Sequence, residues 1–233
     1  MEIPLKNSKM MSKSAYLEII LGPMFSGKTS KLLELYKQYK FCNIPISVIN
    51  HSADTRYHET PSAIASGVQS LFASLTTGAS GFGSLQTMLS SHDKIMIPCI
   101  HTNKLMELWE LDIDDSDPEK MKNYINLRNA EVILINEAQF FEDLIPCVQS
   151  MLKEKKTIYI SGLDGDFERK KFGNIIDLIP LCDKVTKLSS LCNLCKNGSP
   201  GLFSLRLTKE KQQMLIGTDN YIPVCRACYD TNC

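Results

Sequence analysis

The residues best suited to chemistry lie near the start of the chain, in the run Gly22-Pro23-Met24-Phe25-Ser26-Gly27-Lys28-Thr29. This run fits the pattern G-x-x-x-x-G-K-[ST], a loop that wraps around the phosphates of a nucleoside triphosphate. In such a loop the backbone N–H groups point at phosphate oxygens, the lysine reaches the β- and γ-phosphates, and the hydroxyl binds Mg²⁺. The pattern therefore predicts phosphate binding by residues 22–29, with an ordinary glycine turn as the alternative.

The segments on either side of this loop match the strand and the helix that the loop must join. The apolar run 16–21 precedes it, and apolar residues follow at helical spacing over 30–40. The start of that helix adds free N–H groups and the positive end of the helix dipole. This context favours a phosphate-binding loop over an ordinary turn.

Strand and helix signals alternate along the first two-thirds of the chain. Short apolar runs predict strands at 46–49, 94–97, 132–135 and 157–160, and helices are expected at 103–110, 118–128 and 144–155. Alternation at this spacing predicts an α/β fold, with a parallel sheet covered by helices on both faces. Ligands of such sheets lie at the carboxyl ends of the strands, where the phosphate loop also lies.

A carboxylate follows the buried strand 132–135, in the run Asn136-Glu137-Ala138-Gln139-Phe140-Phe141. Phosphoryl transfer needs a group that orients or deprotonates the acceptor, so Glu137 is the candidate general base. The alternative is an exposed glutamate that caps a helix. Phe140 and Phe141 could stack on a nucleobase or fill the core, and core packing is the commoner role of such residues.

A polar loop at 163–173 follows the last predicted strand and contains Phe167 and Phe172. It is either a basic surface loop or a segment that closes over substrate, with Arg169 or Lys170 near a phosphate. The segment 60–90 is different, because it is rich in serine, glycine, alanine and threonine and carries no charge. A loop this long is unusual in a compact domain, so 60–90 is a lid or a flexible insertion, and its composition favours flexibility.

Four of the nine cysteines form two CxxC pairs, Cys192/Cys195 and Cys225/Cys228, with 29 residues between them. Four thiolates close a tetrahedral zinc site, and the residues between the pairs can form a hairpin with strands at 204–207 and 214–217. The alternative is two redox or disulfide pairs. The other five are scattered: Cys42, Cys99, Cys147 and Cys182 have apolar neighbours and are expected to be core residues, and the fifth is Cys233.

Composition excludes several classes of protein. Lys+Arg and Asp+Glu both number 26, so the net charge is zero, which argues against a strongly basic nucleic-acid-binding surface. No apolar stretch approaches the roughly 20 residues of a membrane span. Residues 1–14 lack the apolar centre of a signal peptide, and we expect them to form a frayed tail.

Taken in order, these motifs resemble those of the zinc-containing type II thymidine kinases, a family of cellular and large-virus cytosolic enzymes. Further motifs extend the resemblance to about residues 16–229, excluding 60–90: Asp54-Thr55-Arg56-Tyr57, Ser91-His92-Asp93, Leu163-Asp164-Gly165-Asp166-Phe167 and Tyr221-Ile222-Pro223-Val224. The resemblance implies a phosphate-loop (RecA-like) domain at 1–184 and a zinc domain at 185–233 whose lasso-like loop covers thymidine.

The resemblance also implies roles for residues at the matching positions. Residues 22–29, Asp54, Arg56, Asn136 and Gln139 would bind ATP and Mg²⁺, and Glu137 would deprotonate the 5′-hydroxyl of thymidine. The four paired cysteines would hold zinc. The thymidine pocket would be lined by Met24, Phe140, Leu163, Phe167, Ser204 and Tyr221. The family further implies a cytoplasmic homotetramer that is inhibited by thymidine triphosphate.

Asn136 departs from the family pattern, which has aspartate at this position. An amide keeps an oxygen but loses the charge, so its affinity for a hard cation should fall. Because Asp54 and Thr29 remain, we expect activity to persist but to need more Mg²⁺ than in a relative with aspartate. On this view Asn136→Asp changes the Mg²⁺ dependence.

Two other functions fit part of the sequence. A phosphate-loop ATPase with a zinc ribbon that acts on nucleic acid would explain the loop and the cysteines, but not the phenylalanine-rich segments or the neutral charge. A catalytically weakened nucleotide-binding regulator would explain Asn136 alone. The complete ordered set of motifs favours a nucleoside kinase.

Overall fold

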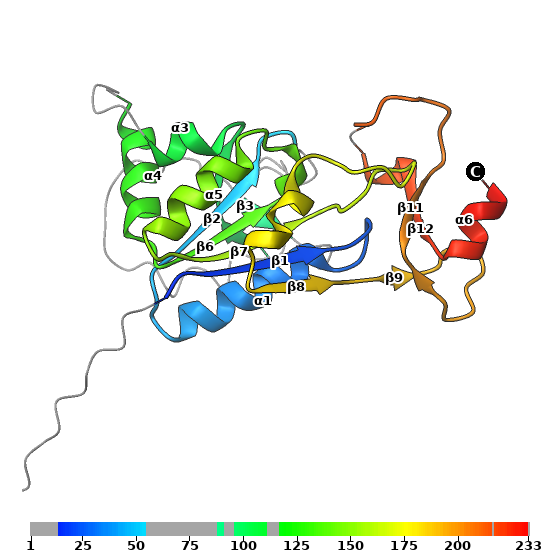
Figure 1. The fold of residues 1–233 in the computed structure, drawn as a ribbon, viewed down its shortest axis with the longest axis horizontal. Coiled ribbons are helices and arrows are strands. Elements are labelled where there is room, and N and C mark those ends of the chain that lie inside the picture. The colour runs from blue at the N-terminus through cyan, green and yellow to red at the C-terminus, as the bar shows by residue number, and fades with distance from the viewer. Residues whose placement is uncertain (1–13, 55–87, 91–95, 111–116, 216, 233) are drawn as a thin grey trace, which may run out of the picture.

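The computed structural model describes residues 14–54, 88–90, 96–110, 117–215 and 217–232 (Figure 1). The expected flexible insertion at 60–90 therefore lies outside the described residues except for its last three. Arg56 also lies outside them, as do residues 1–13 of the expected tail.

Six strands form one parallel sheet in the order β5-β2-β6-β7-β1-β8. Its central strands are apolar and buried on both faces, as parallel sheets require. All five residues of β6, for example, are buried. The strands are β1 Tyr16–Leu21, β2 Ile46–His51, β5 Ile100–Thr102, β6 Val132–Asn136, β7 Thr157–Gly162 and β8 Lys184–Lys187.

Helices cover both faces of this sheet, which confirms the predicted fold class (Figure 1). Alternate residues of one strand serve opposite faces. Leu134 packs with Leu32 and Tyr36 of α1, whereas Ile133 packs with the cluster that contains Trp109 and Met151. The helical segments of this part are α1 Lys28–Phe41, α3 Leu105–Trp109, α4 Pro118–Asn129, η2 Ala138–Phe140, α5 Leu144–Lys153 and η3 Ile175–Leu181.

The predicted strand at 94–97 does not join the main sheet. Instead β4, Met96–Pro98, pairs antiparallel with β3, Met88–Ser90, and β5 takes the edge position beside β2. The prediction that Cys42 is a core residue is wrong, because Cys42 follows the last turn of α1 and is exposed. Cys99 and Cys147 are buried as expected, and Cys182 is partly buried.

A small domain follows β8, which crosses the predicted boundary between 184 and 185. Its elements are β9 Ser190–Leu191, β10 Pro200–Gly201, β11 Phe203–Arg206, η4 Thr218–Asn220, β12 Tyr221–Val224 and α6 Arg226–Asn232. β11 lies where the hairpin was predicted, but the predicted strand at 214–217 is wrong. β12 is the partner of β11, with Phe203 opposite Val224 and Arg206 opposite Tyr221.

Among the described helices, none combines the length and the apolar character that crossing a bilayer demands.

Leu134 tests the packing of β6 against α1. Its side chain is fully buried, so Leu134→Ala is expected to lower the free energy of unfolding by about 2–5 kcal/mol, measured by urea denaturation. Ile125 on α4 is 48% exposed, and Ile125→Ala should change the same quantity by about 0.5 kcal/mol or less. Equal losses in the two variants would contradict this account of the core.

Candidate active site

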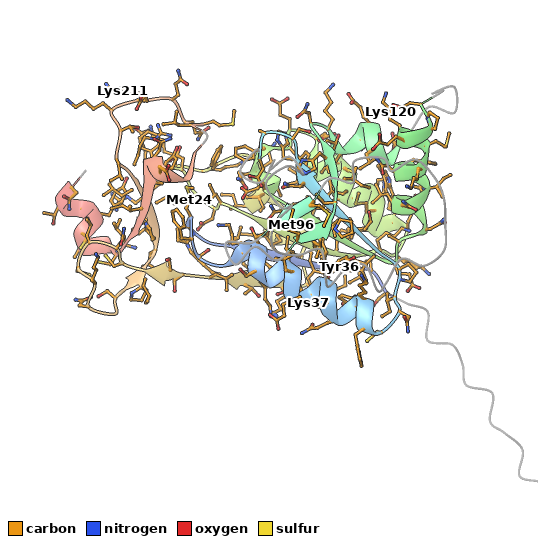
Figure 2. All side chains as sticks on the ribbon, turned by 180° about the vertical axis from the view of Figure 1, so that it is seen from behind. Met24, Tyr36, Lys37, Met96, Lys120 and Lys211 are labelled. Carbon is orange, nitrogen blue, oxygen red and sulfur yellow. The ribbon has the colours of Figure 1, made fainter. Side chains whose placement is uncertain are left out.

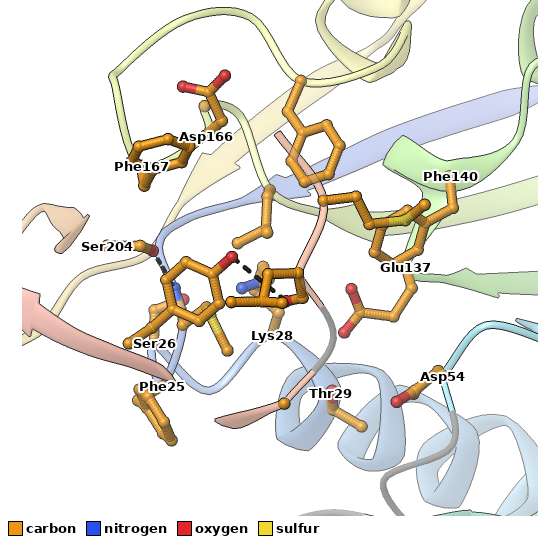
Figure 3. Close-up of a pocket in the computed structure, with 18 of the residues that line it drawn as sticks. Phe25, Ser26, Lys28, Thr29, Asp54, Glu137, Phe140, Asp166, Phe167 and Ser204 are labelled. Carbon is orange, nitrogen blue, oxygen red and sulfur yellow. Dashed lines mark hydrogen bonds between the residues drawn. The ribbon is translucent and has the colours of Figure 1, made fainter. Parts of the chain in front are cut away.

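A pocket opens at the carboxyl edge of the sheet, where the small domain meets the main domain (Figure 3). Met24 lies between the two domains (Figure 2). Thr29, Asp54 and Glu137 gather on one side of the pocket, and Phe167 and Ser204 lie on the other. The residues expected from the sequence that line the pocket are Met24, Phe25, Ser26, Gly27, Lys28, Thr29, Asp54, Glu137, Phe140, Leu163, Phe167, Ser204 and Tyr221.

The phosphate loop has the backbone that its sequence requires. Phe25 and Gly27 both have left-handed φ angles, of 62° and 83°, and α1 begins directly afterwards at Lys28. A left-handed residue at the helix start suits glycine, which adopts it at little cost. The Lys28 ammonium is buried and donates a hydrogen bond to the carbonyl of Pro23 at 2.7 Å. The loop thus folds around its own cation at the amino end of a helix, a site suited to anions.

Ser204 joins the small domain to the phosphate loop. Its hydroxyl oxygen, on β11, accepts a hydrogen bond from the Met24 N–H at 3.0 Å, across 180 residues of sequence (Figure 3). Ser204 was expected beside a bound base. It lines the pocket, and it also holds the Met24 amide of the phosphate loop.

Glu137 is held by both its backbone and its neighbour. Its φ angle of 51° is in the left-handed region, which is unusual for a residue with a side chain. One carboxylate oxygen accepts a hydrogen bond from Gln139 Nε2 at 2.6 Å, and Gln139 Oε1 in turn accepts from the Leu163 N–H at 3.0 Å. Gln139, expected to bind the cofactor, is buried behind Glu137 and ties it to the pocket wall.

Gly173 lets the loop at 163–173 pass close to the backbone of Gln139. Its φ angle is 60°, and a Cβ atom there would lie 2.0 Å from the carbonyl oxygen of Gln139. A side chain at this position would therefore push the loop away from the backbone that carries Gln139.

The two phenylalanines after Glu137 have different roles. Phe141 is 1% exposed and belongs to the core, whereas Phe140 lines the pocket. The Phe140 ring meets Phe172 edge to face with centroids 5.5 Å apart, and His51 lies 5.4 Å from it on another side. Burial lowers the pKa of His51, and its Nδ1 accepts a hydrogen bond from the Ala53 N–H. A neutral imidazole therefore packs behind this aromatic wall.

The loop at 163–173 is fastened to the small domain. Arg169 pairs with Asp230 of α6 at 2.8 Å and lies over the Tyr229 ring, so it points to α6 and not to a phosphate. Tyr229 donates a hydrogen bond to the carbonyl of Phe167. Asp166, which is buried, accepts a hydrogen bond from Gln213 at 2.7 Å.

Arg206 organises the segment between β11 and β12. Its guanidinium donates to the carbonyls of Glu210 and Gln213 at 2.8 and 3.0 Å. The same group lies 3.6 Å from the centroid of the Phe167 ring. One buried cation thus connects a pocket-lining ring with the segment that closes this side of the pocket.

The four paired cysteines come together at the far end of the small domain. The Sγ atoms of Cys192, Cys195, Cys225 and Cys228 all lie within 4.8 Å of one another. Four thiolates at this spacing fit a tetrahedral structural zinc ion. The only core of this region in the described residues is a small cluster around Leu205, Val224 and Tyr229, so metal binding would add directly to its stability.

The oxygen groups on the α1 side of the pocket suit a different metal. The Thr29 hydroxyl and the Asp54 carboxylate line the pocket beside the phosphate loop, and hard oxygen donors are the ligands of Mg²⁺. Asn136 does not line the pocket, since it is 1% exposed and lies within the sheet.

Some functional residues escaped sequence analysis. Asp166, Phe172 and Gln213 line the pocket, and Asn50 donates a hydrogen bond to Asp54 at 3.2 Å. Asn50 could have been found, because it follows a buried apolar run just as Glu137 does. Nothing local in the sequence points to Gln213.

A family model described as "Thymidine kinase" matches residues 15–100 and 85–229 of this chain. The thymidine kinase of Yaba monkey tumor virus is 35% identical over 221 residues, which cover 94% of this chain and 97% of that protein. Thymidine kinase 1 of Dictyostelium discoideum is 31% identical over 217 residues, 93% of this chain and 78% of that protein. The sheeppox virus thymidine kinase is 31% identical and covers 92% and 96%, respectively.

The contacts between α6 and loop 163–173 predict that the metal site orders the pocket. Cys225→Ser is expected to abolish zinc binding, measured by metal analysis. It should also speed hydrogen exchange of the Glu168 and Lys170 amides, which donate to Asp166 at 2.9 Å. Amides of β6 should keep their protection. Cys42→Ser, at an exposed cysteine outside the cluster, is the control, and unchanged exchange in Cys225→Ser would contradict the link.

Proposed function

This chain belongs to the thymidine kinase family, and we propose that its pocket transfers the γ-phosphoryl group of ATP to the 5′-hydroxyl of thymidine, with Glu137 as general base. The observation that carries this proposal is the position of Glu137. The carboxylate faces the same pocket as Lys28 of the phosphate loop and the aromatic side chain of Phe140. A nucleoside whose nucleobase packs against the aromatic wall can then place its 5′-hydroxyl between the Glu137 carboxylate and the triphosphate.

The phosphate loop holds the donor. The amides of residues 24–29 and the amino end of α1 bind phosphate oxygens, and Lys28 exchanges its bond with Pro23 for one with a phosphate. Thr29 and Asp54 would hold Mg²⁺, which would neutralise charge on the triphosphate. Phosphoryl transfer depends chiefly on such positioning and charge neutralisation.

Glu137 acts on the acceptor. The 5′-oxygen forms a bond to the γ-phosphorus as the bond from that phosphorus to the β,γ-bridging oxygen breaks. The hydroxyl proton passes to the Glu137 carboxylate. Gln139 keeps the carboxylate aimed at the hydroxyl, because it donates to one oxygen while the Leu163 amide fixes Gln139. The products are thymidine monophosphate and ADP.

The small domain closes over the nucleoside. Phe167 and Tyr221 line the pocket, and Arg206 fixes the segment around them. Excluding water from this space favours transfer to the hydroxyl over hydrolysis of ATP. Deoxyuridine differs from thymidine by one methyl group, so the pocket should discriminate weakly between the two nucleosides.

We propose further properties of the protein on the strength of its family. Thymidine triphosphate would inhibit, because one molecule can place its base in the nucleoside half of the pocket and its phosphates on the loop. A homotetramer is supported by exposed apolar side chains at the β8 edge of the sheet, with Ile179, Leu181 and Val185 each 42–44% exposed. We place the enzyme in the cytoplasm, and we expect no direct binding to nucleic acid.

Glu137→Gln tests the function directly. Wild-type protein is expected to transfer the labelled γ-phosphate of ATP to thymidine, and more weakly to deoxycytidine and deoxyguanosine. Removal of the base should lower kcat about 10²- to 10⁴-fold with little change in KM. Glu142→Gln, at an exposed glutamate five residues on, is the control. If folded, zinc-loaded wild type transfers phosphate to no nucleoside, the proposal is refuted. ATP hydrolysis stimulated by nucleic acid would then favour the alternative function, an ATPase that acts on nucleic acid.

Asp166 tests whether the small domain closes the nucleoside half of the pocket. Asp166→Ala removes the hydrogen bonds from Gln213 and from the Glu168 and Lys170 amides, so the KM for thymidine should rise about tenfold or more. The KM for ATP should stay constant. Lys170→Ala, which removes an exposed ion pair with Glu168, is the matched control. Equal changes in both KM values would show that Asp166 does not act on the nucleoside side alone.

A further inference from the structure

A row of buried polar side chains crosses the carboxyl edge of the sheet beside the pocket. Asn50 on β2 and Asn136 on β6 are partners in register. Ser161 on β7 directly follows Ile160, the partner of Ile135, so it extends the same row. The three polar residues are 2%, 1% and 0% exposed. Neighbours in register project to the same face of a sheet, which brings their side chains together.

Hydrogen bonds link the row to Asp54. The Ser161 hydroxyl donates to Asn136 Oδ1 at 2.8 Å, and Asn136 Nδ2 donates to Asn50 Oδ1 at 3.0 Å. Asn50 Nδ2 then donates to the Asp54 carboxylate at 3.2 Å. Every bond therefore runs in the same direction, from the interior of the sheet to the pocket.

The carboxylate at the end of the row sets this direction. An ionised carboxylate only accepts hydrogen bonds, so Asn50 must turn its NH₂ group to Asp54 and its oxygen to Asn136. Asn136 must then present its own NH₂ group to Asn50 and its oxygen to Ser161. Only a residue with a donor on one side and an acceptor on the other serves at position 136.

We propose that Asn136 is a positioning residue that acts through Asn50 to hold Asp54 for the Mg²⁺ of bound ATP, an inference that rests on the proposed function. Asn136 uses its amide oxygen and its NH₂ group inside the sheet and does not line the pocket. Groups that bond to metal-binding carboxylates commonly decide metal affinity although they do not touch the ion.

From charge alone, Asn136→Asp is expected to strengthen cation binding, but the row of hydrogen bonds predicts that it weakens it. A carboxylate at 136 can accept from Ser161 but cannot donate to Asn50. Asn50 would then face a carboxylate on each side with a single NH₂ group, and Asp54 would lose the hydrogen bond from Asn50 or meet the Asn50 oxygen. Asn136→Asp should therefore weaken cation binding, whereas a direct ligand role for position 136 predicts that the added charge strengthens it.

Mn²⁺ binding tests the proposal without turnover. The probe is Mn²⁺ titrated into the full-length protein with the imido analogue of ATP, followed by electron paramagnetic resonance. Asn136→Leu and Asn50→Leu are each expected to weaken Mn²⁺ binding about tenfold. The double variant should be no weaker than the single ones, because the two residues act in one chain. Ser47→Ala, a buried serine on β2 outside the row, should leave binding unchanged.

Milder variants cover the case in which leucine at these sites prevents folding. Asn136→Asp is nearly isosteric and Ser161→Ala removes one hydroxyl, and both are expected to weaken Mn²⁺ binding and to raise the Mg²⁺ concentration for half-maximal rate. The KM for thymidine should not change. Tighter or unchanged Mn²⁺ binding in Asn136→Asp, or additive losses in the leucine variants, would overturn the proposal.

The two proposals fail separately. Wild type that binds Mn²⁺ and the ATP analogue but transfers no phosphate to thymidine would refute the kinase function while leaving the Mn²⁺ test of the row intact. Active wild type whose row variants bind Mn²⁺ normally would refute the role of Asn136 alone.

Discussion

Polar groups at the carboxyl edge of the sheet are shielded from water, and each must therefore find a partner within the protein. This constraint arranges the site. The Glu137 carboxylate is bonded to Gln139, and the Asp54 carboxylate takes its place at the end of a row that begins inside the sheet. A parallel sheet brings the ends of β2, β6 and β7 to one edge, so residues distant in sequence can satisfy one another there. The same bonds that remove the cost of burial fix the direction of each functional side chain.

Apolar packing alone stabilises the small domain only weakly, because its core is small and its strands are short. Four thiolates gathered within 4.8 Å offer a metal centre where apolar packing is limited. Helix α6 connects that centre with loop 163–173, since Tyr229 and Asp230 bond to Phe167 and Arg169. The wall around the nucleoside thus rests on the metal end of the domain, although no cysteine of the cluster reaches the pocket.

The sequence located the residues that the structure brings to the pocket and to the cysteine cluster where their pattern is local. The phosphate loop, the CxxC pairs and the carboxylate after a buried strand each carry their signal within a few residues, and the sheet followed from the alternation of strands and helices. It failed where partners are distant. The sequence left open whether Arg169 lies near a phosphate, because its partner Asp230 is 61 residues away. Strand β12 could not be identified because its pairing with β11 spans a long segment. The bonds of Asn136 to Asn50 and Ser161 could not be foreseen either, because these partners lie on other strands.

The bond from the Met24 amide to Ser204 directly links the phosphate loop to the small domain. Met24 belongs to the loop that receives ATP, and Ser204 belongs to the domain that covers the nucleoside. A ligand that alters this bond from one side changes the free energy of the arrangement on the other. Thermodynamic linkage then requires the influence to be equal in both directions, so that ATP affects the affinity for the nucleoside by the same factor as the nucleoside affects the affinity for ATP. Any such coupling would act through the direct contact between the phosphate loop and β11 that the Ser204 hydroxyl provides.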